Sequence, residues 1–227
     1  MTQLRHRRSV VILAALACFV LLTGCDALRP FEQVCERKLE PASFRVSAAP
    51  MQHELDLTLS AAQLGARGAA AAGRLILGIT SAQMKSSVSA GGNALTAPFS
   101  RRYCVRPQVE VTLTVEPLKV AIAREHAPGS CEHVLTLNHE MKHVLVYERY
   151  LAELVVTVET ELKTSIGDRV RHFASRADGE RELPLLIEQS VKPLIEAGMR
   201  QAQQRQAAVD TPEEYARLDA LQARCLR

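Results

Sequence analysis

The chain has 227 residues, of which 47% are hydrophobic and 23% are charged, and its formal net charge is +3. This length and composition predict one domain of ordinary size with a real core, and they exclude a chain that is disordered or fibrous throughout. The charge is nearly balanced and only 4% of the residues are aromatic, so the sequence has no basic, stacking surface and we expect no nucleic-acid partner.

The first 24 residues have the pattern of an export signal. Basic residues in 1–9 precede an apolar run at 10–22, which is too short to span a bilayer comfortably as a helix. The stretch "LTGC" (22–25) resembles the bacterial lipobox, which implies cleavage before Cys25 and acyl chains on that cysteine. The alternatives are a signal peptide with a chance cysteine and an N-terminal membrane anchor.

The predicted mature chain begins at Cys25. We assign 1–24 to the signal peptide, 25–50 to the lipidated cysteine and a tether, and 51–227 to one domain. The signal segment holds three arginines and no acid, so its removal lowers the formal charge from +3 to 0. These features predict a lipid-anchored protein of the bacterial cell envelope that faces the periplasm. Asp26 favours the inner membrane, because an aspartate there resembles a retention signal.

Four cysteines follow the predicted lipidation site: Cys35, Cys104, Cys131 and Cys225. An even number in an exported chain predicts two disulfides, for which three pairings are possible. We predict Cys104–Cys131, because these two flank a predicted hairpin, and hence Cys35–Cys225. The alternative, zinc ligation by cysteines, lacks the C-x-x-C spacing that such sites use.

The segment 51–126 is predicted to be rich in β-structure. Alternating or apolar stretches predict strands at 53–60, 74–80, 108–115 and 118–124. The last two flank Glu116-Pro117 and are expected to form a hairpin. Residues 86–98 contain Gly-Gly-Asn and several serines, which predicts a loop.

The segment 130–227 is predicted to be helical. No glycine or proline interrupts residues 131–166, which predicts one long helix that ends at Gly167. Further helices are expected at 183–208 and 210–225. The predicted fold class is therefore α+β: a small, mostly antiparallel sheet followed by a long helix and further helices.

The long predicted helix contains the motif His139-Glu140-Met141-Lys142-His143. Residues four apart lie on one face of a helix about a turn apart, so His139 and His143 can bind the same metal ion. Zinc lowers the pKa of a bound water to about 7, and Glu140 can accept the proton of that water. The motif thus predicts a Zn²⁺ site with Glu140 as the catalytic base. The alternative is a solvated His/Glu/Lys stripe on a surface helix.

The surroundings of this motif resemble a family of predicted secreted zinc-dependent proteases of uncharacterised function. The likeness rests on "GSCEHVLTLNHEMKHV" (129–144), which follows the strand pair "CVRPQVEVTLTVEPLKVAIA" (104–123), and it covers roughly residues 75–150. In that family a cysteine-bearing β-hairpin leads into an H-E-x-x-H helix. The resemblance implies a zincin-like core, with the two histidines as zinc ligands and the glutamate as base.

The sequence leaves the third protein ligand open. The metzincin pattern needs a glycine and a histidine where Val146 and Arg149 stand, so that class is excluded. Glu159 and Glu161 would lie more than about 20 Å along an unbroken helix, too far to reach the same ion. The remaining candidates are His126, His172 and Glu213.

These features predict a membrane-anchored zinc metallopeptidase that hydrolyses peptide or amide bonds of a peptide or protein substrate. One alternative is a non-catalytic envelope lipoprotein with a metal-binding or assembly role. Another is a zinc amidase that acts on the cell wall. The non-catalytic alternative stays open because the sequence does not identify a third ligand, and two histidines alone bind zinc weakly.

Overall fold

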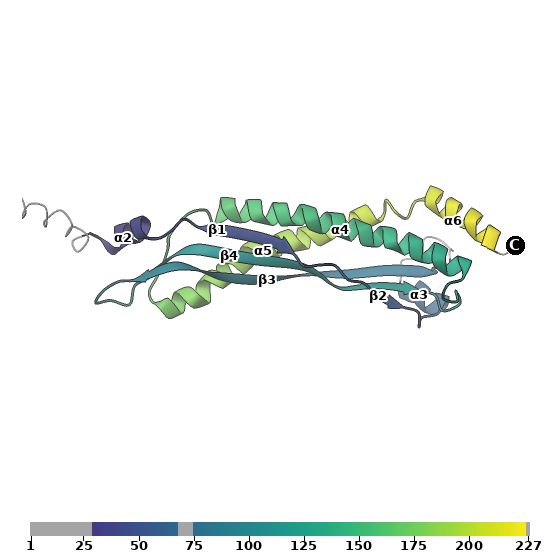
Figure 1. Ribbon diagram of the computed structural model, residues 1–227, viewed down its shortest axis with the longest axis horizontal. Helices are drawn as coiled ribbons and strands as arrows, with labels where there is room; N and C mark the ends of the chain where they lie inside the picture. Colours follow the sequence, from purple (N-terminus) through teal and green to yellow (C-terminus); the bar gives the residue numbers. More distant parts are fainter. Residues whose placement is uncertain (1–28, 68–74, 226–227) are drawn as a thin grey trace, which may run out of the picture.

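The structure is a computed structural model that describes residues 29–67 and 75–225. Its sheet is built around one long strand, β4 (Tyr103–Ile122). β3 (Gly78–Thr96) pairs with β4 in the antiparallel direction from end to end. Three short strands follow one another along the opposite edge of β4: β5 (Arg171–Phe173), β1 (Ser43–Ala48) and β2 (Glu54–Asp56). The result is a long, narrow sheet (Figure 1).

The strand directions correct the prediction of a mostly antiparallel sheet. β1 and β2 run parallel to β4, whereas β3 and β5 run antiparallel to it, so the sheet is mixed. The chain places β1 and β2 along the edge of β4 in one continuous pass, and both short strands therefore share its direction. An alternating sequence shows which face of a strand is buried, but it does not show the direction of the partner strand. The coarser prediction, one sheet combined with long helices, is confirmed.

The hairpin predicted around Glu116-Pro117 is wrong. Both of its strands belong to the single strand β4, and the chain turns earlier, at residues 97–102. The proline fits inside β4 because the pairing with β3 is irregular opposite it, between Ala82 and Met84. A residue without an N–H therefore interrupts no regular ladder at this point.

The loop predicted at 86–98 is also wrong, because most of this segment is the second half of β3. Its Gly-Gly-Asn stretch pairs with β4 residue by residue, with Gly92 opposite Pro107. Gly92 has a φ of +147°, and a Cβ atom there would overlap with the carbonyl oxygen of Arg106. The glycine therefore allows a close approach of two strands and does not mark a turn.

The predicted long helix is confirmed as α4 (Cys131–Ser165). The hydroxyl of Ser130 caps its start by accepting a hydrogen bond from the His133 N–H (3.1 Å). Gly167, two residues beyond the end of the helix, terminates it as predicted: its φ is +60° and its N–H donates to the Leu162 carbonyl (3.3 Å).

Two further helices complete the C-terminal half. α5 (Arg176–Gln206) starts before the predicted residue 183, because the Ser175 hydroxyl caps it by accepting a hydrogen bond from the Asp178 N–H (3.2 Å). α6 (Pro212–Cys225) confirms the predicted last helix. In Figure 1, α5 runs back along α4, and α6 follows it next to the start of α4.

The segment in which a tether is expected is folded where the structure describes it. α2 (Phe31–Lys38) and β1 both lie within residues 29–50, and a short helix, α3 (Ala61–Arg67), follows β2. The predicted signal peptide, 1–24, and Cys25 lie outside the described residues. Within 29–67 and 75–225, no helix has the length and apolarity needed to cross a membrane.

Two disulfides form, as predicted, but both predicted pairings are wrong. Cys35–Cys104 ties α2 to the start of β4, and Cys131–Cys225 ties the start of α4 to the end of α6. The predicted pairs, Cys104–Cys131 and Cys35–Cys225, rest on a hairpin between Cys104 and Cys131 that the structure does not contain. The two residues instead stand near opposite ends of the molecule, at the starts of β4 and α4 (Figure 1). Disulfides persist in an oxidising, extracytoplasmic environment.

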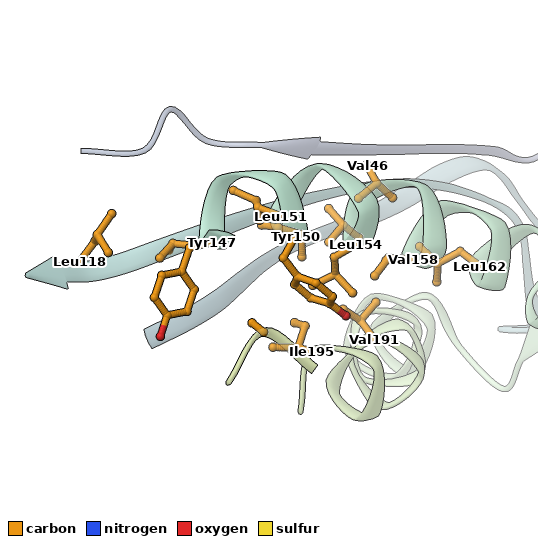
Figure 2. Packing of buried hydrophobic residues seen from close by; sticks show 14 of the residues in the cluster. Val46, Leu118, Tyr147, Tyr150, Leu151, Leu154, Val158, Leu162, Val191 and Ile195 are labelled. Atoms are coloured by element: carbon orange, nitrogen blue, oxygen red, sulfur yellow. The ribbon is translucent and has the colours of Figure 1, made fainter. Parts of the chain in front are cut away.

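The core lies between the sheet and the two long helices. Every second residue from Val109 to Val115 of β4 is buried, as expected for a sheet that is covered on one face. Figure 2 shows Leu154 and Val158 of α4 in one cluster with Val191 of α5 and Val46 of β1. This packing fixes the long axis of α4 on the sheet, and so it fixes the direction in which the motif side chains point.

Gly92→Ala is expected to lower the free energy of unfolding by about 1–3 kcal/mol, because alanine is strained at a positive φ and overlaps with the backbone of Arg106. Gly91→Ala is the matched control, since a Cβ atom at this neighbouring residue would meet nothing within 4 Å. Chemical denaturation of the two variants measures the difference. Equal stabilities would contradict the tight pairing of β3 with β4 at this point.

Candidate metal centre

α4 carries the two motif histidines on its inner side, near the end where the helix begins. His139 is 6% exposed and His143 is 8% exposed, and their ring centroids lie 5.1 Å apart in an edge-to-face arrangement. The pair is therefore buried next to the C-terminal elements, unlike the solvated surface stripe that is the alternative interpretation of the motif.

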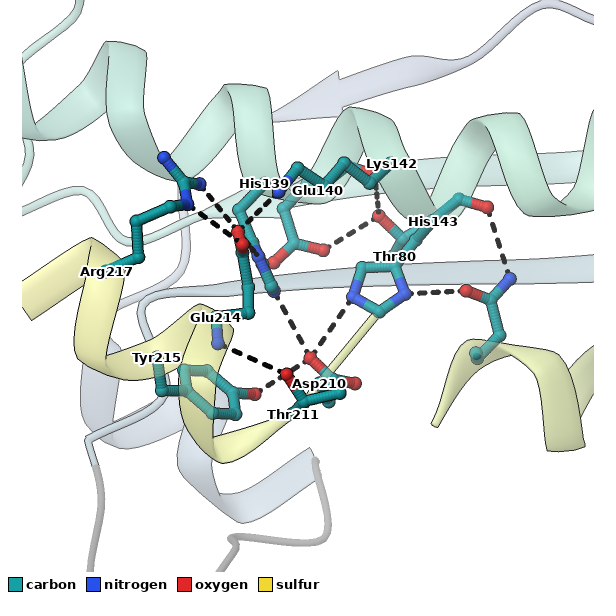
Figure 3. A network of polar contacts seen from close by, with 11 residues as sticks. Thr80, His139, Glu140, Lys142, His143, Asp210, Thr211, Glu214, Tyr215 and Arg217 are labelled. Carbon is teal, nitrogen blue, oxygen red and sulfur yellow. Dashed lines mark hydrogen bonds and ion pairs between the residues drawn. The ribbon is translucent and has the colours of Figure 1, made fainter. Parts of the chain in front are cut away.

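Asp210, in the short link between α5 and α6, is the third group of the site. Its Oδ1 atom lies 3.2 Å from His139 Nε2 and 3.4 Å from His143 Nε2. His139, His143 and Asp210 each offer one possible ligand atom, and these three atoms all lie within 4.8 Å of one another. Figure 3 shows Asp210 below both imidazole rings, on the side where the chain returns from α5.

The other nitrogen of each imidazole faces an oxygen acceptor. His143 Nδ1 lies 2.6 Å from Gln206 Oε1, and the amide nitrogen of Gln206 donates to the His143 carbonyl (3.1 Å). His139 Nδ1 lies 3.4 Å from Glu214 Oε1. An acceptor opposite Nδ1 holds the ring proton on that nitrogen, so the Nε2 lone pair of each histidine is available to a metal.

Glu214 joins the site to two surface cations. Lys142 donates to Oε1 of this carboxylate at 2.5 Å, and Arg217 donates to the same oxygen at 2.7 Å. The Arg217 hydrogen bond, supported by Lys142 and His139, holds the pKa of Glu214 well below its ordinary value. The carboxylate that orients His139 is therefore ionised at neutral pH.

Asp210 is also held from a second side. The hydroxyl of Tyr215 donates to Asp210 Oδ1 (2.8 Å), the same oxygen that faces both imidazoles. Partial burial alone would raise the pKa of Asp210, but the hydrogen bonds with His139, His143 and Tyr215 outweigh it and hold the pKa well below its ordinary value. An ionised carboxylate is the form that ligates a metal ion.

Glu140 is buried between α4 and β3. Its exposed fraction is 4%, and its Oε2 atom accepts a hydrogen bond from the Thr80 hydroxyl (2.8 Å). Burial raises the pKa of Glu140, while the Thr80 hydrogen bond and the charges of His143 and His139 act against that rise. Gly78 leaves room for the carboxylate, since a Cβ atom on that residue would lie 2.5 Å from Oε1.

The three candidates for the third ligand lie outside this group. His126 Nδ1 lies 3.2 Å from the hydroxyl of Thr136, and His172 stands in β5 opposite Cys104. Glu213 is exposed in the first turn of α6. The exclusion of Glu159 and Glu161 holds, because α4 continues unbroken to Ser165.

Asp210 is a candidate ligand that the sequence prediction did not include, although the sequence contains a signal for it. A helix that returns along α4 brings residues beyond 205 back to the level of the motif, and Asp210 is the first acid in that stretch. It stands directly before Thr211, whose hydroxyl caps α6 by accepting a hydrogen bond from the Glu214 N–H (3.2 Å). The cap fixes the backbone next to the ligand.

The donor set fits a metal ion. Two imidazole nitrogens and one carboxylate oxygen are ligands that divalent transition metals accept. The N–O separations of 3.2 Å and 3.4 Å match the edge of about 3.3 Å in a tetrahedral zinc site. Three protein ligands leave one coordination position open, as in catalytic sites.

No protein-family model, curated protein or solved structure matches the chain. The centre is therefore defined by its own residues and geometry.

Asp210→Ala is expected to weaken zinc binding by roughly 100-fold or more, since it removes a direct ligand, whereas loss of an outer partner typically costs 10–100-fold. Glu213→Ala is the matched control, because this nearby carboxylate lies outside the ligand group. Competition with a chromophoric chelator measures both affinities. Equal weakening in the two variants, or none in Asp210→Ala, would contradict the assignment of the third ligand.

The Cys131–Cys225 disulfide is expected to support the metal centre, because it holds α6, with Glu214 and Tyr215, against the start of α4. Replacing both cysteines by serine should weaken zinc binding roughly 10-fold or more. The double serine variant of Cys35–Cys104 is the control.

The disulfides Cys131–Cys225 and Cys35–Cys104 span 94 and 69 residues, so each should contribute a similar stability of about 4.5 kcal/mol by restricting the unfolded chain. Zinc affinity and the free energy of unfolding are measured for both variants. Unchanged zinc affinity after loss of Cys131–Cys225 would show that α6 keeps its place without the bond.

Proposed function

We propose that this protein is a zinc-dependent metallohydrolase that cleaves peptide or amide bonds, with His139, His143 and Asp210 as ligands and Glu140 as the base. The observation that carries the proposal is the position of Asp210 Oδ1, which faces the Nε2 atoms of both motif histidines. A set of three such ligands with an open fourth position is typical of catalytic zinc, whereas structural zinc is usually closed by four protein ligands.

Zinc held by these residues would activate a water molecule and polarise the carbonyl group of the substrate. The protein's own contribution is the base. Glu140 is buried beside the two histidines, and burial raises its pKa above the ordinary value of a glutamate, which makes the carboxylate a better proton acceptor. Its role would be to accept a proton from the water and to return it to the leaving amine.

Two residues of β3 keep this base in place. The Thr80 hydroxyl donates to the Glu140 carboxylate, and Gly78 opposite it has no side chain to displace the carboxylate. A base that is fixed before the substrate binds loses little freedom in the reaction, which supports the catalytic over the purely metal-binding role. Glu140 has no ligand role in this scheme.

The location and the family of the protein are part of the same proposal. The two disulfides support an oxidising compartment, and the lipobox-like stretch at 22–25 supports anchoring through an acylated Cys25 in the bacterial envelope. A long H-E-x-x-H helix packed on a sheet is compatible with a zincin-like protein of the predicted secreted protease type. The substrate class would be peptides or proteins of the envelope.

Glu140→Gln is expected to retain zinc and to lower turnover by roughly 10²–10⁴-fold, because the amide cannot accept the proton while the ligands stay intact. Glu148→Gln, on the exposed side of the same helix, is the matched control and should keep full turnover. Turnover is measured with a mixture of internally quenched peptides, and zinc content is measured by elemental analysis. A Glu140→Gln variant with full zinc and undiminished hydrolysis would contradict the role of the base.

A further inference from the structure

The tip of the β3–β4 hairpin carries one fully exposed aromatic residue. Phe99 has a relative exposure of 109%, the largest among the exposed large hydrophobic side chains of the described residues. It stands in the turn at 97–102, which contains Arg101 and Arg102 and no acid. A phenylalanine in such a place contributes nothing to the core of this protein.

The backbone at Phe99 is also unfavourable for this residue. Its φ is +61°, the only positive φ of a non-glycine residue in the described part of the chain. Glycine or asparagine adopts this conformation at much lower cost than a bulky aromatic residue. Folding and stability alone would therefore favour another residue at position 99, which indicates that the exposed ring serves an interaction.

The hairpin tip lies beside the start of the described chain. The guanidinium group of Arg102 lies over the Phe31 ring, 5.4 Å from its centroid, and donates to Glu32 at 2.6 Å. The Cys35–Cys104 disulfide fixes α2 to the start of β4, directly after the hairpin turn. Figure 1 shows α2 and the hairpin turn at the same end of the molecule. Phe99 and the entry of the chain at Arg29 therefore share one end.

The longest apolar run of the sequence, at 10–22, precedes Arg29, the first residue that the structure describes. Whether that run stays as an anchor or is removed to leave an acylated Cys25, the bilayer would be attached just before Arg29. When fully extended, the chain reaches at most about 14 Å from Cys25 to Arg29, and at most about 25 Å from the end of the apolar run at Leu22 to Arg29. A membrane attached there must lie close to the hairpin tip.

We propose that the hairpin tip docks on the membrane, with the Phe99 ring inserted at the boundary between the lipid headgroups and the acyl chains. Amphipathic surface elements bind bilayers through buried apolar area together with basic residues at the headgroups. Glu32 lies beside Arg102 and Asp178 lies near Arg101, so the ring rather than net charge is the main contact. This proposal rests on the proposed membrane attachment, and it adds an orientation to it.

The orientation has a consequence for the metal centre. α4 runs from the metal centre toward the hairpin end, and His139 lies about 40 Å along the helix from Ser165 at about 1.5 Å per residue. A molecule that stands on its hairpin tip would hold the centre far above the bilayer surface. Its substrates would then be chains that extend into the periplasm, and not the membrane-proximal segments of integral proteins.

The test uses the absence of tryptophan from the chain. Phe99→Trp introduces a single reporter at the tip, and Leu145→Trp introduces one on the exposed side of α4, where the side chain is 46% exposed. Each full-length chain is isolated from membranes and reconstituted into vesicles of phosphatidylcholine and phosphatidylglycerol in equal parts. Emission spectra are recorded with ordinary lipids and with brominated lipids, which quench only inserted tryptophan.

The proposal predicts that the Phe99→Trp emission shifts to shorter wavelength and loses most of its intensity in brominated vesicles, while the Leu145→Trp emission does neither. A chain that co-sediments with the vesicles but shows no quenching at position 99 would overturn tip docking and leave the attachment intact. A chain that does not co-sediment would overturn both. Binding of a protein partner at the tip would give a shift that does not depend on vesicles, and it would also overturn the proposal.

Phe99→Gly separates docking from folding. Glycine accepts the positive φ without strain, so the variant should be at least as stable as the wild type. If the ring orients the molecule, Phe99→Gly should make the hairpin more accessible to a protease added outside the vesicles. Equal protease accessibility of the wild type and this variant would overturn the proposal.

Discussion

The return of the chain to the start of α4 is the constraint on which the candidate metal centre depends. His139 and His143 come from one helix, and any helix with this spacing would bring them together. Asp210 follows the C-terminal end of α5, and it reaches the two histidines only because α5 runs back along α4. With this carboxylate between the two imidazoles, three side chains could hold one metal ion, whereas two histidines alone bind zinc weakly.

The rest of the fold keeps that return in place. The long β3–β4 pair supports α4 and α5 along their length, and Val158 and Val191 are completely buried between them. Cys131–Cys225 then joins the two ends of the segment that carries all the ligands. The Glu140 carboxylate is held against the sheet, by the Thr80 hydroxyl and by the space that Gly78 leaves, whereas Asp210 is held by the link between α5 and α6.

The sequence predicts those features that depend on local spacing. The bounds of α4, the face shared by His139 and His143, and the break at Gly167 follow from periodicity and from residue types. The strand partners and the disulfide pairs do not follow, because they depend on which distant segments meet. The wrongly predicted hairpin illustrates this dependence on distant segments. Pro117 indicates a turn by its residue type, but an irregularity in the pairing with β3 accommodates it inside β4.

The third candidate ligand depends on both kinds of information, local sequence spacing and contacts between distant segments. A returning helix predicts that residues beyond 205 reach the motif, but which acid points inward depends on the length of the link between α5 and α6. Glu213 lies only three positions from Asp210, and yet it stays on the surface. Which of these two acids faces the histidines depends on the cap at Thr211 and on the hydrogen bond from the Tyr215 hydroxyl. Both are contacts in the folded chain and are not visible as sequence patterns.

The most direct measurement is X-ray absorption at the zinc edge, on the full-length protein loaded with one equivalent of zinc. The structure predicts a first shell of nitrogen and oxygen atoms at about 2.0 Å, with the outer scattering of two imidazole rings and no sulfur. A shell with fewer than two imidazoles, or with sulfur at about 2.3 Å, would contradict a centre built from His139, His143 and Asp210.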